Sequence, residues 1–213
     1  MGGIECLLLI PFLIYFKVLD KGGKWMFYYL LSSLIFAYGS LFIGHFWKNN
    51  MWFFSIMYFA QFVILSRFFQ IIIKNELVKR CITLILLPVF IIFLADFLKL
   101  EGLYAYNSYF ATAKTFILLI YGAIFFWQLL KDEELIKKSI FINSLPNFWY
   151  NAGLFIYHCG AFMLFLAYNL LQQAKEPTVP RTMNLTISIS YIAAIIQLIL
   201  IYIGLVKAKK MRR

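Results

Sequence analysis

Charged residues are scarce in this chain, and acidic residues are the scarcest of them. Only 14% of its 213 residues are charged, with nine acidic residues against twenty basic ones, whereas 63% are hydrophobic. A soluble domain of this length cannot bury so much apolar surface, so the composition excludes an ordinary soluble fold. We therefore expect an all-α, polytopic integral membrane protein with a single transmembrane domain over residues 1–213.

Cysteine, histidine and catalytic motifs are also sparse. Cys6, Cys81 and Cys159 fall at different expected depths, which predicts no disulfide. The chain has no Cys-x-x-Cys, His-Glu-x-x-His or Gly-x-Ser-x-Gly motif, so we expect neither a metal centre nor a cofactor. A haem held between His45 and His158 is disfavoured, because helix rise places them about 12 Å apart in depth.

Seven apolar segments are present in place of these motifs. They cover residues 4 to 17, 26 to 46, 51 to 73, 81 to 98, 107 to 130, 147 to 171 and 185 to 206. The first segment is short and contains Pro11, so a six-helix count remains an alternative. It lacks the basic start and the small-residue cleavage site of a signal peptide, and we interpret it as a retained helix.

The basic residues predict the orientation of these segments. Fourteen of the twenty fall on one side, in the loops after the first, third and fifth segments and in the tail "KAKKMRR". By the positive-inside rule the N-terminus lies outside and the C-terminus inside, at a cell membrane that we expect to be a bacterial inner membrane. The net charge of +11 then reflects topology and contact with anionic lipids, and no nucleic acid is expected as a partner.

The loops are too short to hold a further domain. The longest inner one, "KDEELIKKSIFINSLP", predicts a short surface helix before a new helix begins near Pro146. It is either a docking element for a cytoplasmic partner or a solvated connector. Small residues at Ser33, Ala37, Ser40 and Gly44, and at Gly153 and Gly160, predict faces that pack closely against neighbouring helices.

Charged residues within the predicted spans need partners or a route to the interface. Asp96 and Lys114 are both expected in the outer leaflet on consecutive helices, so they either form an ion pair or extend separately toward the interface. Arg67 lies about 10 Å from the inner end of its helix and is expected to extend toward the cytoplasmic headgroups.

Polar residues recur on one face of several predicted helices, which is typical of a bundle interior. They are weighted toward the outer half, and Glu5, His45, Asn151 and Asn169 extend the pattern. We therefore predict a ligand pocket open to the outside. Its candidate residues are Tyr58, Gln61, Asp96, Lys114, Tyr121, His158 and Gln197. For His158, a role in simple packing remains an equal alternative.

Two stretches, "FVILSRFFQIIIKN" and "LPNFWYNAGLFIYHCGAFMLFLAYNLL", carry a resemblance in pattern. The chain resembles uncharacterised bacterial seven-helix membrane proteins and, more loosely, the seven-transmembrane sensory regions of bacterial signalling receptors. The resemblance implies a sensor that signals through a cytoplasmic partner such as a histidine kinase, since no kinase segment follows the last helix.

Two other function classes remain open. Small-solute transporters built from parallel repeats share the length and helix count, but Pro11 has no counterpart at the matching position of the fifth segment. An intramembrane lipid-modifying enzyme would need an acid or base, for which Asp96, Glu5 and His45 are the only candidates.

Overall fold

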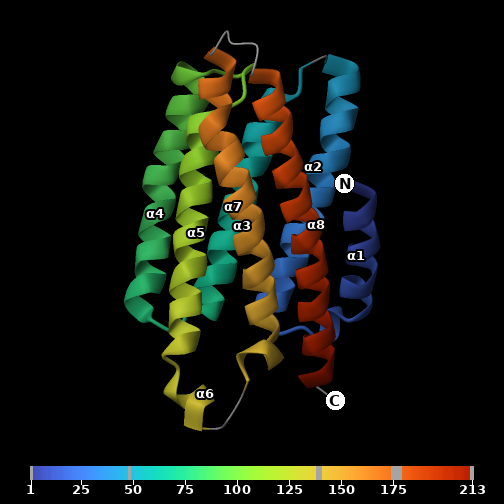
Figure 1. Ribbon diagram of the computed structural model, residues 1–213, viewed down its shortest axis with the longest axis vertical. Coiled ribbons are helices and arrows are strands. Elements are labelled where there is room, and N and C mark those ends of the chain that lie inside the picture. Colours follow the sequence, from blue (N-terminus) through green and yellow to red (C-terminus); the bar gives the residue numbers. More distant parts are fainter. Residues whose placement is uncertain (1, 48, 138–140, 174–178, 212–213) are drawn as a thin grey trace.

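The computed structural model is a bundle of helices aligned along one axis (Figure 1). The backbone is described for residues 2–47, 49–137, 141–173 and 179–211, and the side chains for 7–47, 49–135, 141–166 and 184–211. No strand occurs in these residues. The all-α prediction is therefore confirmed.

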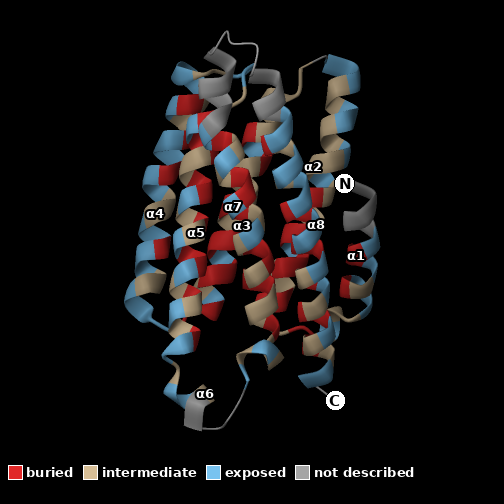
Figure 2. Cartoon of the chain, in the orientation of Figure 1, coloured by how far each residue is buried: buried red, intermediate tan, exposed pale blue. Residues whose placement is uncertain are grey.

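Five stretches of the described chain are long and apolar enough to cross a membrane. They are Lys21–Trp47 (α2), Met51–Ile72 (α3), Glu76–Leu100 (α4, Glu76–Ala95, continued by the π-helical turn η2, Asp96–Leu100), Ser108–Leu130 (α5), and Asn184–Met211 within α8 (Val179–Met211). Their outward surfaces suit contact with lipid, since large apolar side chains such as Leu84 and Leu87 of α4 are exposed (Figure 2). The structure supports a membrane protein.

The two remaining predicted segments correspond to α1 (Gly2–Ile14) and α7 (Pro146–Gln173). α1 has only 13 residues, fewer than the roughly 20 that cross a hydrocarbon core, and it ends before the predicted residue 17. α7 begins at Pro146, as predicted. α4 begins five residues before predicted residue 81, because the Asn75 side chain accepts the N–H groups of Leu77 and Val78 and caps the helix.

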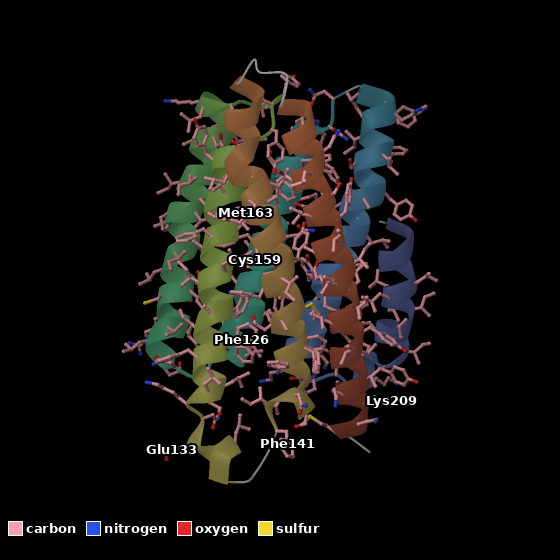
Figure 3. All side chains as sticks on the ribbon, viewed as in Figure 1. Phe126, Glu133, Phe141, Cys159, Met163 and Lys209 are labelled. Carbon is pink, nitrogen blue, oxygen red and sulfur yellow. The ribbon has the colours of Figure 1, made fainter. Side chains whose placement is uncertain are left out.

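The bundle has a lower and an upper end in the view of Figure 1. The lower end carries α6 (Glu133–Lys137) and the end of α8, and the upper end carries the ends of α2 and α7 and the starts of α3 and α8. Glu133 and Lys209 both lie at the lower end (Figure 3). In the predicted topology the lower end is cytoplasmic.

α7 and α8 pack closely against each other, because small residues stand where their backbones meet. A Cβ added at Gly160 would lie 2.9 Å from the Cβ of Ala193, and one at Gly153 would lie 2.9 Å from the Gln197 carbonyl oxygen. Ser190 also donates a hydrogen bond of 3.1 Å to the Gly160 carbonyl. The predicted close packing at Gly153 and Gly160 is confirmed.

The half-length helix α1 packs against α2 and α8 in the lower part of the bundle. Its Phe12 is fully buried, with a ring centroid 6.2 Å from that of Tyr150 on α7. α1 begins near mid-height (Figure 1), and its Leu7 and Leu8 lie beside Ile195 and Leu198 of α8.

Polar contacts tie the lower end together. Lys74, after α3, forms an ion pair of 2.8 Å with Asp132, before α6. The Gln128 side chain accepts the Lys74 N–H at 2.5 Å and donates to the Ile72 carbonyl at 3.2 Å. The hydrogen bond with Asp132 raises the pKa of Lys74, and the same bond lowers the pKa of Asp132.

Candidate functional site: a cavity between α2, α3, α7 and α8

A cavity of about 260 Å³ lies between four helices, close to the lower limit of about 300 Å³ for small-molecule sites. Along α2 it extends from Tyr29 to Leu41, a rise of about 18 Å. Its wall combines hydroxyl and amide groups with apolar and aromatic groups. The lining residues are Tyr29, Ser33, Phe36, Ala37, Ser40, Leu41, Phe54, Tyr58, Gln61, Tyr157, Ala194 and Gln197.

Two side-chain amides in the wall are held by hydroxyl groups of α2. The Gln61 amide donates to the Ser33 hydroxyl oxygen at 3.2 Å. The Gln197 amide donates to the Tyr29 hydroxyl oxygen at 3.0 Å, joining α8 to α2. Each bond fixes the orientation of its amide group toward the cavity. Of the predicted site residues, Tyr58, Gln61 and Gln197 therefore meet in one place.

The small-residue face of α2 has two uses in the structure. Ser33, Ala37 and Ser40 line the cavity. Further up, a Cβ added at Gly44 would lie 3.3 Å from the Asn50 amide, and that amide donates to the Ser40 hydroxyl at 2.8 Å. Packing against a neighbouring helix, which the sequence favoured over a ligand role for this face, is found where α2 meets the start of α3.

Lys114 lies directly behind the cavity wall. Its side chain is 4% exposed, and its Nζ lies 3.9 Å from the centroid of the Tyr58 ring. Tyr58 contacts both the cavity and Lys114, whereas Lys114 itself does not line the cavity. Among the described side chains, no carboxylate oxygen lies within 4.0 Å of the Lys114 ammonium.

The predicted ion pair between Asp96 and Lys114 is not formed. Asp96 is fully buried, and its Oδ2 accepts the backbone N–H of Phe110 at 2.8 Å. Glu101 accepts both the N–H and the hydroxyl of Ser108 nearby. Both carboxylates thus cap the first turn of α5, where free N–H groups and the helix dipole favour negative charge. Asp96 is a helix cap away from the cavity.

His158 is buried beside the cavity. It is 5% exposed, and it follows Tyr157, which lines the wall. Neither ring nitrogen has a hydrogen-bond partner among the described residues. Ala111 and Ala161 pack together one turn above Lys114 and His158 respectively. The lysine and the histidine therefore lie at the same depth, on the α5 and α7 sides of the cavity wall.

Tyr121 lies apart from the cavity. It is 2% exposed, and its ring centroid is 5.7 Å from that of Phe69. It follows Lys114 by seven residues on α5, which places it about 10 Å lower. Asn151, predicted on the same polar pattern, donates to the Gly122 carbonyl at 3.1 Å and joins α7 to α5. Glu5 and Asn169 lie outside the described side chains.

Arg67 is exposed on the outer surface of α3. Its guanidinium donates to Gln70 one turn below at 3.0 Å, and Gln70 donates to Thr83 of α4 at 2.7 Å. Arg67 takes no part in the cavity.

Comparison with protein-family models, curated proteins and solved structures finds no match to this chain. The function is therefore argued from the cavity itself. Sequence reasoning missed Tyr29, Ser33, Ser40 and Tyr157 as lining residues. Ser33 and Ser40 could have been found, because both belong to the small-residue face of α2 that the sequence shows.

Proposed function

We propose that this protein is a receptor-like integral membrane module that binds a small molecule or lipid and relays occupancy to a cytoplasmic partner. The single observation that carries the proposal is the cavity, which places hydroxyl and amide groups around open space inside an apolar bundle. Polar groups at membrane depth are costly unless they serve packing, solvation or binding. Here they surround a space of ligand size.

The proposal includes seven membrane passes with the N-terminus outside, in a bacterial inner membrane. The basic residues Lys17, Lys74 and Lys131 belong to connections at the lower end. Cysteine labelling in intact cells should find residues 48–50, 99–106 and 172–184 outside, and residues 131–145 inside. A cytoplasmic 172–184 loop would overturn this topology.

Relay requires the lower end to change when the cavity is filled, since a ligand shifts an equilibrium only by binding two conformations differently. α3 and α8 both line the cavity and both continue to the lower end. There, α6 and the basic C-terminal turns offer a charged surface to a soluble partner such as a histidine kinase. Site-specific photo-crosslinking from Glu133 and Lys209 tests for that partner.

Transport is the second candidate, and a second cavity favours it. It measures about 330 Å³ and lies at the lower end, with Asp20, Lys74, Asp132 and Asn147 in its wall. Between the two cavities, however, the α3 residues Phe62, Leu65 and Phe69 are all at most 1% exposed. A transport path would have to open this apolar layer, so binding with relay accounts for the structure more directly.

The deciding experiment fills the cavity. Ala37→Phe places a ring in the cavity, whereas Ile35→Phe, its control, adds a ring to a lipid-facing position that is 51% exposed. Native mass spectrometry of protein purified in native-lipid nanodiscs should find a bound molecule in the wild type and control, and lose it in Ala37→Phe. The yield of the crosslinked partner should also differ between Ala37→Phe and the wild type. A molecule retained by Ala37→Phe would refute the site, and solute uptake by proteoliposomes without a partner would favour transport.

A further inference from the structure

The cavity wall carries no charged residue, but a buried cation stands behind it. All twelve lining residues are neutral. The Lys114 ammonium contacts the ring of Tyr58 at 3.9 Å, and no described carboxylate lies within 4.0 Å of it. A ring face offsets only part of the cost of a buried charge. The remainder calls for a negative charge that the described side chains do not supply.

We infer that the cavity binds a single-chain amphiphile with a carboxylate head group, such as a free fatty acid. The inference rests on the proposed ligand-binding function and adds the chemical class of the ligand. A carboxylate in the cavity at the edge of the Tyr58 ring would lie roughly 8 Å from the ammonium, which stands 3.9 Å from the ring centroid. In a partly buried setting a charge at that distance favours an anion over its neutral homologue by tenfold or more.

The polar wall suits the same head group. The cavity wall offers donors that a carboxylate accepts from, namely the hydroxyl groups of Ser33 and Ser40 and the amide of Gln61. A cationic head would be repelled by Lys114. A head group that accepts hydrogen bonds and carries negative charge matches both the donors and the buried cation.

The shape of the cavity indicates one chain. It extends for about 18 Å along α2 and encloses about 260 Å³, a long and narrow space that suits one acyl chain beside a small head group. Phe36, Phe54 and Ala194 provide apolar contacts within it. At its upper end, Leu41 is 72% exposed, so the wall reaches the lipid-facing surface. An acyl chain leaves the cavity there and continues into the bilayer.

The test compares head groups on one chain length. Protein in phosphatidylcholine nanodiscs is titrated with radiolabelled dodecanoic acid, and dodecanol, dodecylamine and dodecyl phosphate serve as competitors. The acid should bind at least tenfold tighter than the alcohol, and the amine should bind weakest. Stronger binding of the phosphate would reject the carboxylate in favour of a phosphate head group. Equal binding of acid and alcohol would overturn the role of charge.

A matched pair of lysine variants identifies the cation. Lys114→Met keeps the length of the side chain and removes its charge, and should weaken dodecanoic acid at least tenfold while leaving dodecanol unchanged. Lys131→Met is the control: this lysine also contacts an aromatic ring, with its Nζ 4.4 Å from the Trp127 centroid, but it lies beyond the lower end of α5. It should leave both affinities unchanged. Equal losses in the two variants would refute the inference.

Failure of this inference is distinguishable from failure of the proposed function. If Ala37→Phe blocks acid and alcohol alike and the two bind equally, the cavity remains the site and only the carboxylate is rejected. If no dodecyl compound depends on Ala37 and no molecule co-purifies, the binding function itself is rejected. The head-group comparison uses only wild-type protein, so it holds even where Lys114→Met does not fold.

Discussion

In the lower half of the bundle, side chains fill the space between α1, α2, α7 and α8, whereas in the upper half part of that space is open. Below, Phe12, Met26, Tyr150 and Ile201 are fully buried, and Gly204 stands against the Tyr150 ring. Above, the seam between α2 and α8 is lined by hydroxyl and amide groups around a cavity. α1 overlaps both regions in height, because its Leu7 and Leu8 lie beside Ile195 and Leu198, level with Gln197 of the cavity wall.

On the proposed binding function, this contrast separates the region that stabilises the fold from the region that binds the ligand. Close packing of rings and glycines makes the lower half intolerant of added atoms. The upper half gives up packing at the cavity, as binding sites commonly do. Substitutions of the same kind in the two halves should therefore have different effects on stability.

The largest effect is expected from Gly204→Ala in the lower half. Its new Cβ would meet the Tyr150 ring at 2.5 Å and the Pro146 carbonyl oxygen at 3.1 Å, so a fully buried ring must move. We expect a loss of about 2 kcal/mol in the free energy of unfolding, measured by SDS titration in mixed micelles. Gly44→Ala is the control in the upper half: its Cβ would lie 3.3 Å from the Asn50 amide, the end of a side chain, so the free energy of unfolding should change by less than about 1 kcal/mol in either direction. Equal effects would remove the contrast.

Asp96→Ala should cost about as much as a lost helix cap, about 1 to 2 kcal/mol, because the buried Phe110 N–H loses its acceptor. Lys114→Met should stabilise the empty protein, since it removes a buried charge. A double-mutant cycle should find the two changes additive within about 0.5 kcal/mol. A larger coupling energy would indicate that Asp96 and Lys114 interact, as in the ion pair that the sequence suggested.

Ala37→Phe should alter the free energy of unfolding by less than about 1 kcal/mol, because the added ring enters existing space. The measurement is the same SDS titration, carried out without added amphiphile. A loss above about 2 kcal/mol would mean that the wall around Ala37 is packed as tightly as the lower half.

The smallest effect concerns the lower-end ion pair and pH. Folding lowers the pKa of Asp132, so the ionised carboxylate stabilises the folded protein at any pH above its unfolded pKa of about 3.9. That stabilisation is lost as the pH falls through the lower pKa of the folded state. Asp132→Asn should therefore lower the thermal midpoint slightly at pH 7, and this difference should vanish in strong acid. Glu134→Gln, whose partner distance to Lys74 is 3.7 Å, is the control and should show less change.

The sequence predicted the helices well and the neighbours of polar residues less well. Period and hydropathy place Tyr58, Gln61 and Gln197 on interior faces, and all three line the cavity. Helix rise per residue placed Asp96 and Lys114 at similar depths. It does not show which faces of two helices are turned toward each other, so the predicted contact between them was wrong. Asp96 instead accepts a hydrogen bond from the backbone N–H of Phe110, in the first turn of the next helix along the chain. Depth alone does not reveal such a capping role.

The exposed upper rim of the cavity has a consequence for how a ligand would reach it. Leu41 lines the cavity and is 72% exposed on the outer surface of α2. On the binding function proposed above, an amphiphile would enter sideways from the lipid leaflet and need not cross from water. Its occupancy would then follow its mole fraction in that leaflet, and the protein would report on the make-up of the membrane that holds it.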